Sequence, residues 1–183
     1  MKILVCISSV PDTTSKINFT ADKSAFDKNG IQWVINPYDE FALTKAVKLQ
    51  ESQGATVTIA TVGDAATEAV MRKALAIGAN DAIRVNAEPQ DSITVAKELA
   101  KIAEEGGYDL VFCGKESIDY NGAAVPAMIA QLLNRPFVNA CVGLEVNGAE
   151  ATVVREIEGG KETLTVKIPA VIAGQKGMVE EKD

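Results

Sequence analysis

The chain has 183 residues, and 25 Asp and Glu against 18 Lys and Arg give it a formal net charge of −7. This length fits one domain with a core large enough to fold without disulfides or metals. The acidic balance, without clustered Lys and Arg, argues against a nucleic-acid binder. The absence of histidine excludes histidine-based triads and histidine metal ligands.

The apolar segments and the cysteines indicate the compartment. No apolar run reaches the roughly 18 residues of a membrane-spanning helix, and the first residues lead directly into a strand. We therefore expect a soluble, cytoplasmic protein without direct membrane insertion. The three cysteines, Cys6, Cys113 and Cys141, show no C-x-x-C spacing and lie among apolar or small residues. We expect all three to be buried as small hydrophobic side chains.

The first three quarters of the chain alternate strand-like and helix-like segments. Apolar, β-branched runs predict strands, and apolar residues at helical spacing followed by glycine predict helices. Strands are expected at 2–7, 56–62, 81–85 and 109–113, and helices at 38–53, 65–77 and 92–105. This alternation predicts a parallel sheet with right-handed crossovers and helices on both faces.

Two segments depart from the alternation. Residues 12–30 are polar and contain turn signals, so we expect a surface excursion or a small hairpin. Beyond residue 136, strand-like segments are separated by Asn147–Gly148 and Gly159–Gly160, which are strong hairpin signals. They predict an antiparallel β meander of strands at 142–146, 152–157 and 163–168, followed by a segment at 170–173 that is suited to return to the main sheet.

The stretch Gly114–Pro126 is the most informative, because it follows a predicted strand and opens a helix of small residues. Backbone N–H groups at a helix N-terminus bind anions, and Gly and Ala allow close approach. Asn36–Glu40 stands at the start of another helix, and ligands of parallel sheets bind beyond the carboxyl ends of the strands. The two segments predict a nucleotide site. A close helix–sheet contact and an ordinary Asn-Pro turn are the alternatives that the residues alone leave open.

The sequence as a whole resembles the beta subunits of the electron transfer flavoproteins, within the adenine-nucleotide-binding α/β superfamily. The resemblance rests on the order and spacing of segments along the entire chain. They are 2–7 with 10–12, 35–40 with Ala42, Ala46 and Val47, 72–79, 109–119, 154–160, Leu164 and 167–171. It implies one α/β domain over residues 1–183, with a parallel sheet flanked by helices of the adenine-nucleotide alpha-hydrolase-like type and an appended antiparallel β meander.

The resemblance implies an electron-carrier subunit rather than an enzyme. Such a subunit binds AMP, or a second FAD in bifurcating relatives, and pairs with an alpha subunit that carries the redox FAD. The complex passes electrons from flavin-dependent dehydrogenases to an acceptor. No catalytic residue and no metal ligand are implied in this chain. The implied cofactor-binding residues, with backbone contacts dominant, are Cys6, Asn36, Pro37, Tyr38, Asp39, Val62, Gly63, Gly114, Asp119, Tyr120, Asn121, Gly122, Ala123, Ala124 and Val125.

Two departures from the family pattern matter. Many relatives have an Asp-Thr-Ala-Gln-Val-Gly-like phosphate loop where this chain has Asn121–Pro126, which offers fewer side-chain phosphate ligands. The choice between AMP and FAD therefore stays open. Relatives also continue for several tens of residues beyond Ile172, into a partner-docking loop and an arm that embraces the alpha subunit. Because this chain ends at Asp183, we expect a domain truncated before that arm.

Two rival classes share the superfamily. A free-standing adenine-nucleotide-binding stress or signalling protein usually carries a G-x2-G-x9-G-[Ser/Thr] phosphate signature, which is absent. A nucleotide-activating enzyme carries Ser-Gly-Gly-x-Asp-Ser and His-x-Gly-His motifs, which are also absent. The electron-carrier subunit is therefore the favoured interpretation, and the stress or signalling protein is the alternative.

Overall fold

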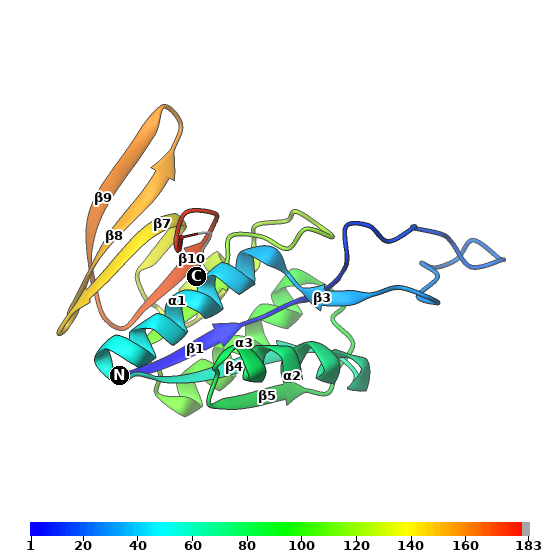
Figure 1. Ribbon diagram of the computed structural model, residues 1–183, viewed down its shortest axis with the longest axis horizontal. Helices are drawn as coiled ribbons and strands as arrows, with labels where there is room; N and C mark the ends of the chain where they lie inside the picture. Colours follow the sequence, from blue (N-terminus) through cyan, green and yellow to red (C-terminus); the bar gives the residue numbers. More distant parts are fainter. Residues whose placement is uncertain (181–183) are drawn as a thin grey trace.

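The computed structural model describes residues 1–180, and eight of its strands form one sheet (Figure 1). The strands are β1 (Lys2–Cys6), β4 (Thr56–Val62), β5 (Asp81–Val85), β6 (Leu110–Gly114), β7 (Phe137–Asn147), β8 (Glu150–Ile157), β9 (Gly160–Lys167) and β10 (Ala170–Gly174). Their order across the sheet is β5-β4-β1-β6-β10-β7-β8-β9. The strands from β5 to β7 are parallel, and β8 and β9 are antiparallel. The predicted parallel sheet with an appended meander is confirmed.

Helices cover both faces of the parallel strands. In the described chain, α1 (Pro37–Gln53) and α2 (Glu68–Ile77) pack on one face, and α3 (Ser92–Gly106) and α4 (Val125–Leu132) pack on the other. Successive strand residues point to opposite faces, so β1 places Ile3 and Val5 in the core under α1 and α2, and Leu4 and Cys6 in the core under α3 and α4. No helix within residues 1–180 is both long and apolar enough to cross a bilayer.

Local chemistry explains the bounds of α1, the helix that carries part of the candidate site. Pro37 stands at its first turn, where a missing N–H group removes no intrahelical hydrogen bond. Leu43, Ala46 and Leu49 are buried at helical spacing. Gly54 ends the helix in the left-handed conformation, with φ of 68°. The result is one buried stripe that presses the helix onto β1, β6 and β10.

The excursion and the meander also have physical causes. Strands β2 (Ser9–Pro11) and β3 (Trp33–Ile35) pair antiparallel as a separate sheet, and residues 12–30 project from it, as predicted (Figure 1). Strand β7 begins five residues earlier than the sequence indicated. Its first half pairs in parallel with β10, its second half pairs with β8, and Ala140 between them has φ of 51°. The irregularity joins the parallel sheet to the meander.

The connections define a switch point at the centre of the sheet. The chain leaves β1 toward α1 on one face, whereas it leaves β6 toward α4 on the opposite face. Strands β1 and β6 are neighbours, so the loops that follow them leave the sheet toward opposite faces, and this arrangement predicts a ligand crevice between the two carboxyl ends. In doubly wound sheets this position is the usual place for a ligand.

Candidate functional site

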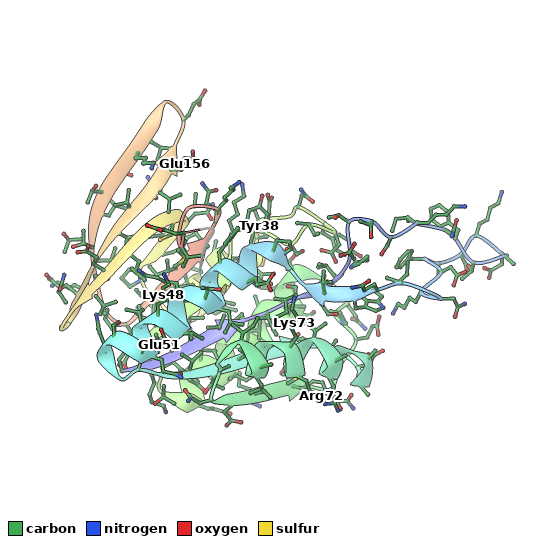
Figure 2. The ribbon with its side chains drawn as sticks, viewed as in Figure 1. Tyr38, Lys48, Glu51, Arg72, Lys73 and Glu156 are labelled. Atoms are coloured by element: carbon green, nitrogen blue, oxygen red, sulfur yellow. The ribbon has the colours of Figure 1, made fainter. Side chains whose placement is uncertain are left out.

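The structure places the implied cofactor-binding residues at the carboxyl edge of three neighbouring strands. Cys6 ends β1, Val62 ends β4 and Gly114 ends β6, and the strands run side by side in parallel. Asn36–Asp39 forms the first turn of α1 at the same edge, where Figure 2 labels Tyr38. The segment from Asp119 to Ala124 leads from β6 to α4, whose first residue is Val125. Residues far apart in sequence therefore share one edge.

Asp39 joins the two strands that flank the switch point. Its Oδ2 accepts a hydrogen bond from the N–H of Ser8 at 2.7 Å, and its Oδ1 accepts one from the N–H of Gly114 at 2.7 Å. The residue is only 4% exposed. Burial, which disfavours the charged carboxylate, outweighs these hydrogen bonds and raises the pKa of Asp39 to about 7. Both carboxylate oxygens of Asp39 are therefore bonded to backbone groups of the protein itself.

Asn36 holds the loop that follows β6. Its Nδ2 donates to the carbonyl oxygen of Glu116 at 2.8 Å, and its Oδ1 accepts from the N–H of Ile118 at 3.2 Å. Asn36 is fully buried, and both sides of its amide are used. Lys115 of the same loop lies 5.2 Å from the ring centre of Tyr38. The first turn of α1 therefore fixes the path of residues 114–118.

Two glycines at this edge are required by close packing. A Cβ atom on Gly114 would lie 2.5 Å from Oδ1 of Asp39 and 2.8 Å from its backbone nitrogen, so the helix start leaves no room for one. A Cβ on Gly63 would overlap the Cγ2 methyl group of Thr67. The backbone N–H of Gly63 donates to Val85, and its carbonyl accepts from Arg84 Nη1 at 3.1 Å. Arg84 therefore supports a predicted site loop, although a lone arginine on an edge strand gave no sequence signal.

The cysteines at the edge are buried side by side. Cys6 and Cys113 lie on adjacent strands, point to the same face, and are 5% and 4% exposed. A hydrogen bond with Cys6, together with burial, raises the pKa of Cys113 well above its usual range. Burial also raises the pKa of Cys141 to about 11. The expected burial of the three cysteines is confirmed.

The loop before α4 is the exposed part of the site. Residues 119–123 are exposed, and Tyr120 is 88% exposed. Asn121 and Ala123 have left-handed φ values of 51° and 49°, and no side chain caps the first turn of α4. Successive N–H groups in such conformations form concave anion sites, and a helix N-terminus adds a positive dipole end. The loop therefore suits a phosphate group.

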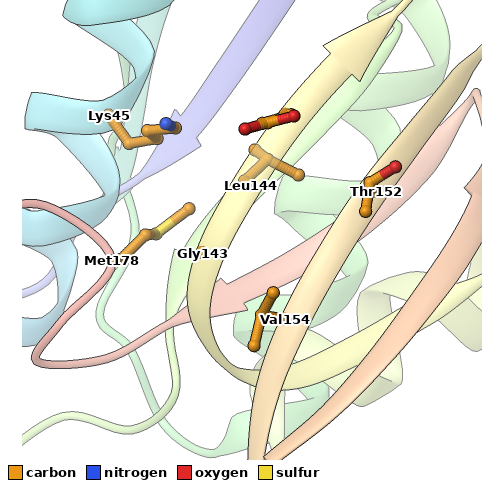
Figure 3. A pocket seen from close by; sticks show the side chains of 7 residues that line it. Lys45, Gly143, Leu144, Thr152, Val154 and Met178 are labelled. Carbon is orange, nitrogen blue, oxygen red and sulfur yellow. The ribbon is translucent and has the colours of Figure 1, made fainter.

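A second hollow lies outside this cluster. A cavity of about 360 Å³ is lined by Lys45 of α1 together with residues of β7, β8 and the C-terminal segment (Figure 3). The other lining residues are Gly143, Leu144, Glu145, Thr152, Val154 and Met178. None of them belongs to the implied cofactor-binding set. The sequence gave no indication of this cavity, because its walls come from four segments that are separate in the sequence.

The fold and the clustered loops define a doubly wound α/β protein with a candidate ligand site at its switch point. The model of the electron transfer flavoprotein domain matches residues 24–183. Relatives include electron transfer flavoprotein subunit beta of Bacillus subtilis, 32% identical over all of this chain and 72% of its own length. The subunit beta of Thermoanaerobacterium thermosaccharolyticum is 35% identical over 96% of this chain and 68% of its own. Protein FixA of Azotobacter vinelandii is 34% identical over 98% of this chain and 67% of its own length. The chain belongs to the electron transfer flavoprotein family, as the resemblance predicted.

Proposed function

We propose that this chain is a beta-type electron transfer flavoprotein subunit that acts as an electron carrier, not as an enzyme, in the cytoplasm. It binds AMP, or a second FAD, and pairs with an alpha-type subunit that holds the redox FAD. The complex passes electrons from flavin-dependent dehydrogenases to an acceptor. The family match supports this class and speaks against the free-standing stress or signalling protein.

One observation supports nucleotide binding above the others. The strand ends of β1, β4 and β6 lie side by side at the switch point, and Asn36 and Asp39 hold two of the loops there by hydrogen bonds. Held loops reduce the entropy lost when a ligand binds. The uncapped start of α4 then offers backbone donors to a phosphate group. The residues present therefore fit the phosphate and the nucleoside of an adenine nucleotide.

The division of roles follows from these contacts. Flavin, when bound in the complex, supplies the redox chemistry. The side chains of Asn36 and Asp39 position backbone groups, while Gly122 and Ala123 present N–H donors. Asn121, whose own N–H donates to the carbonyl oxygen of Ser117 at 2.8 Å, shapes the loop that holds them. We propose that Cys6, Val62 and Gly63 line the nucleoside end and that Val125 and Ala124 lie at the phosphate end, with Pro37, Tyr38, Gly114, Asp119 and Tyr120 between them.

Release of the bound molecule tests the proposal directly. Protein purified without added nucleotide is heated, and the molecule released into the supernatant is identified by mass spectrometry. AMP and FAD are then titrated calorimetrically into unheated protein. AMP or FAD at near-stoichiometric amounts is the expected result. If neither is released and neither binds on titration, the nucleotide-binding role is wrong.

A further inference from the structure

The carboxylate of Asp39 occupies a distinctive position in the crevice. Its two oxygens bind N–H groups that belong to different strands' loops, Ser8 after β1 and Gly114 at the end of β6, each at 2.7 Å. These strands flank the switch point. Backbone N–H groups at such a point are the donors that usually serve a ligand's anionic group. In this chain an internal carboxylate uses both of them.

The Asp39 carboxylate is closely packed against Gly114 and is almost fully buried. Gly114 has no room for a Cβ atom, because one would lie 2.5 Å from Oδ1 of Asp39. Asp39 is 4% exposed, so water does not replace these contacts. Hydrogen bonds from N–H groups to a carboxylate are among the stronger ones in proteins. The N–H groups of Ser8 and Gly114 therefore form an anion-binding position that the Asp39 carboxylate already occupies.

We propose that Asp39 determines which end of the ligand enters the crevice. Its carboxylate fills the anion position between β1 and β6 and confines a nucleotide's phosphate to the loop of Asn121–Val125. A second anion in the crevice would find both donors already used and, once the carboxylate is ionised, would also meet a like charge. An uncharged nucleoside meets no such repulsion. The orientation of the nucleotide rests on the proposed function. That the Asp39 carboxylate occupies the anion position rests only on its hydrogen bonds to Ser8 and Gly114.

Chemical rescue tests the occupied position. Replacing Asp39 by Ala removes the three carboxylate atoms and leaves two unpaired N–H donors, a space that formate matches in charge and in number of heavy atoms. At about pH 8, where the native carboxylate is ionised, sodium formate should raise the Tm of the Asp39→Ala variant in a saturable manner. Sodium chloride at equal ionic strength should not. If the variant is unfolded without formate, recovery of its circular dichroism is the same measurement.

Two controls make the result specific. Glu40→Gln removes one negative charge from the next residue, whose carboxylate pairs with Lys73 at 3.1 Å outside the crevice. Wild type and this control should show no formate-specific stabilisation. Asp39→Asn fills the space with a neutral amide and should also fail to respond. Equal rescue of Asp39→Asn and Asp39→Ala, or no rescue of Asp39→Ala beyond that of wild type, would overturn the inference.

A second measurement concerns the ligand. Formate should bind the Asp39→Ala variant about tenfold or more tightly than it binds wild type or Glu40→Gln. Unchanged formate affinity would count against Asp39 as the group that excludes anions from the crevice. Failure of wild type to bind AMP or FAD counts instead against the proposed function, so the two failures are distinguishable.

Discussion

Burial of the Asp39 carboxyl group couples its protonation to folding. The pKa of Asp39 is raised to about 7, so the folded protein retains a proton that the unfolded chain loses near the ordinary carboxyl value. Between these two values the folded state binds more protons, and stability falls as the pH rises. Cys113, whose ionised form would be repelled by the charge of Asp39, has a pKa well above its ordinary value and stays neutral over this window.

The prediction is therefore a pH-dependent difference between wild type and Asp39→Asn, which cannot titrate at this position. The free energy of unfolding of wild type, relative to the variant, should decrease from about pH 4 to about pH 7 and then level off. Urea denaturation across this range measures it, with Glu40→Gln as the control for a neighbouring carboxylate. A difference that increases with pH would contradict the burial effect.

Gly122 gives a second prediction at the scale of one residue. A Cβ atom added there meets no protein atom within 4 Å, its chain neighbours aside, and the loop is exposed, so Gly122→Leu should fold normally. The leucine would project into the proposed phosphate position, and the affinity for AMP or FAD should fall by about tenfold or more. Calorimetric titration measures the loss. Gly160→Leu is the matched control, since a side chain at Gly160 also meets no atom within 4 Å. Equal affinities of the two variants for the nucleotide would show that its phosphate does not bind at this loop.

At the scale of elements, the junction between α1 and the loop after β6 depends on Asn36. Asn36→Ala would leave the carbonyl of Glu116 and the N–H of Ile118 without their partner. Each buried polar group left unpaired costs about 1–3 kcal/mol, so a clear loss of stability is expected, together with weaker nucleotide binding. Chemical denaturation measures the first effect. Asn29→Ala, at an exposed position of the excursion, should change neither quantity.

The same junction shows what sequence patterns reveal and what they do not. The bounds of β4 and the end of α1 were predictable, because apolar periodicity and a terminal glycine are local signals. The first half of β7 was not, because it owes its strand conformation to β10. The structure brings Asn36 and Asp39 to the carboxyl edge of the sheet, and their part in nucleotide binding stays a prediction. Their hydrogen bonds reach 31 to 82 residues along the chain, and no local pattern reports such contacts.

At the scale of the whole molecule, we predict that the isolated chain carries little tightly bound yellow flavin. The proposed redox FAD belongs to the alpha-type partner, and the loop at 119–123 is open to water in this chain. An absorption spectrum of the purified protein should lack strong flavin bands. Stoichiometric flavin absorption would favour the second-FAD alternative over AMP. The spectrum of a complex with an alpha-type subunit serves as the positive reference.

The place of β10 in the sheet governs the order of assembly during synthesis. The last strand within residues 1–180 lies between β6 and β7, both of which are made before it. Until Ala170–Gly174 leaves the ribosome, β6 and β7 each have one unpaired edge, on the side where β10 lies between them in the finished sheet. Such edges invite pairing with other chains, so the protein depends on rapid capture of this last strand or on a chaperone that shields the gap.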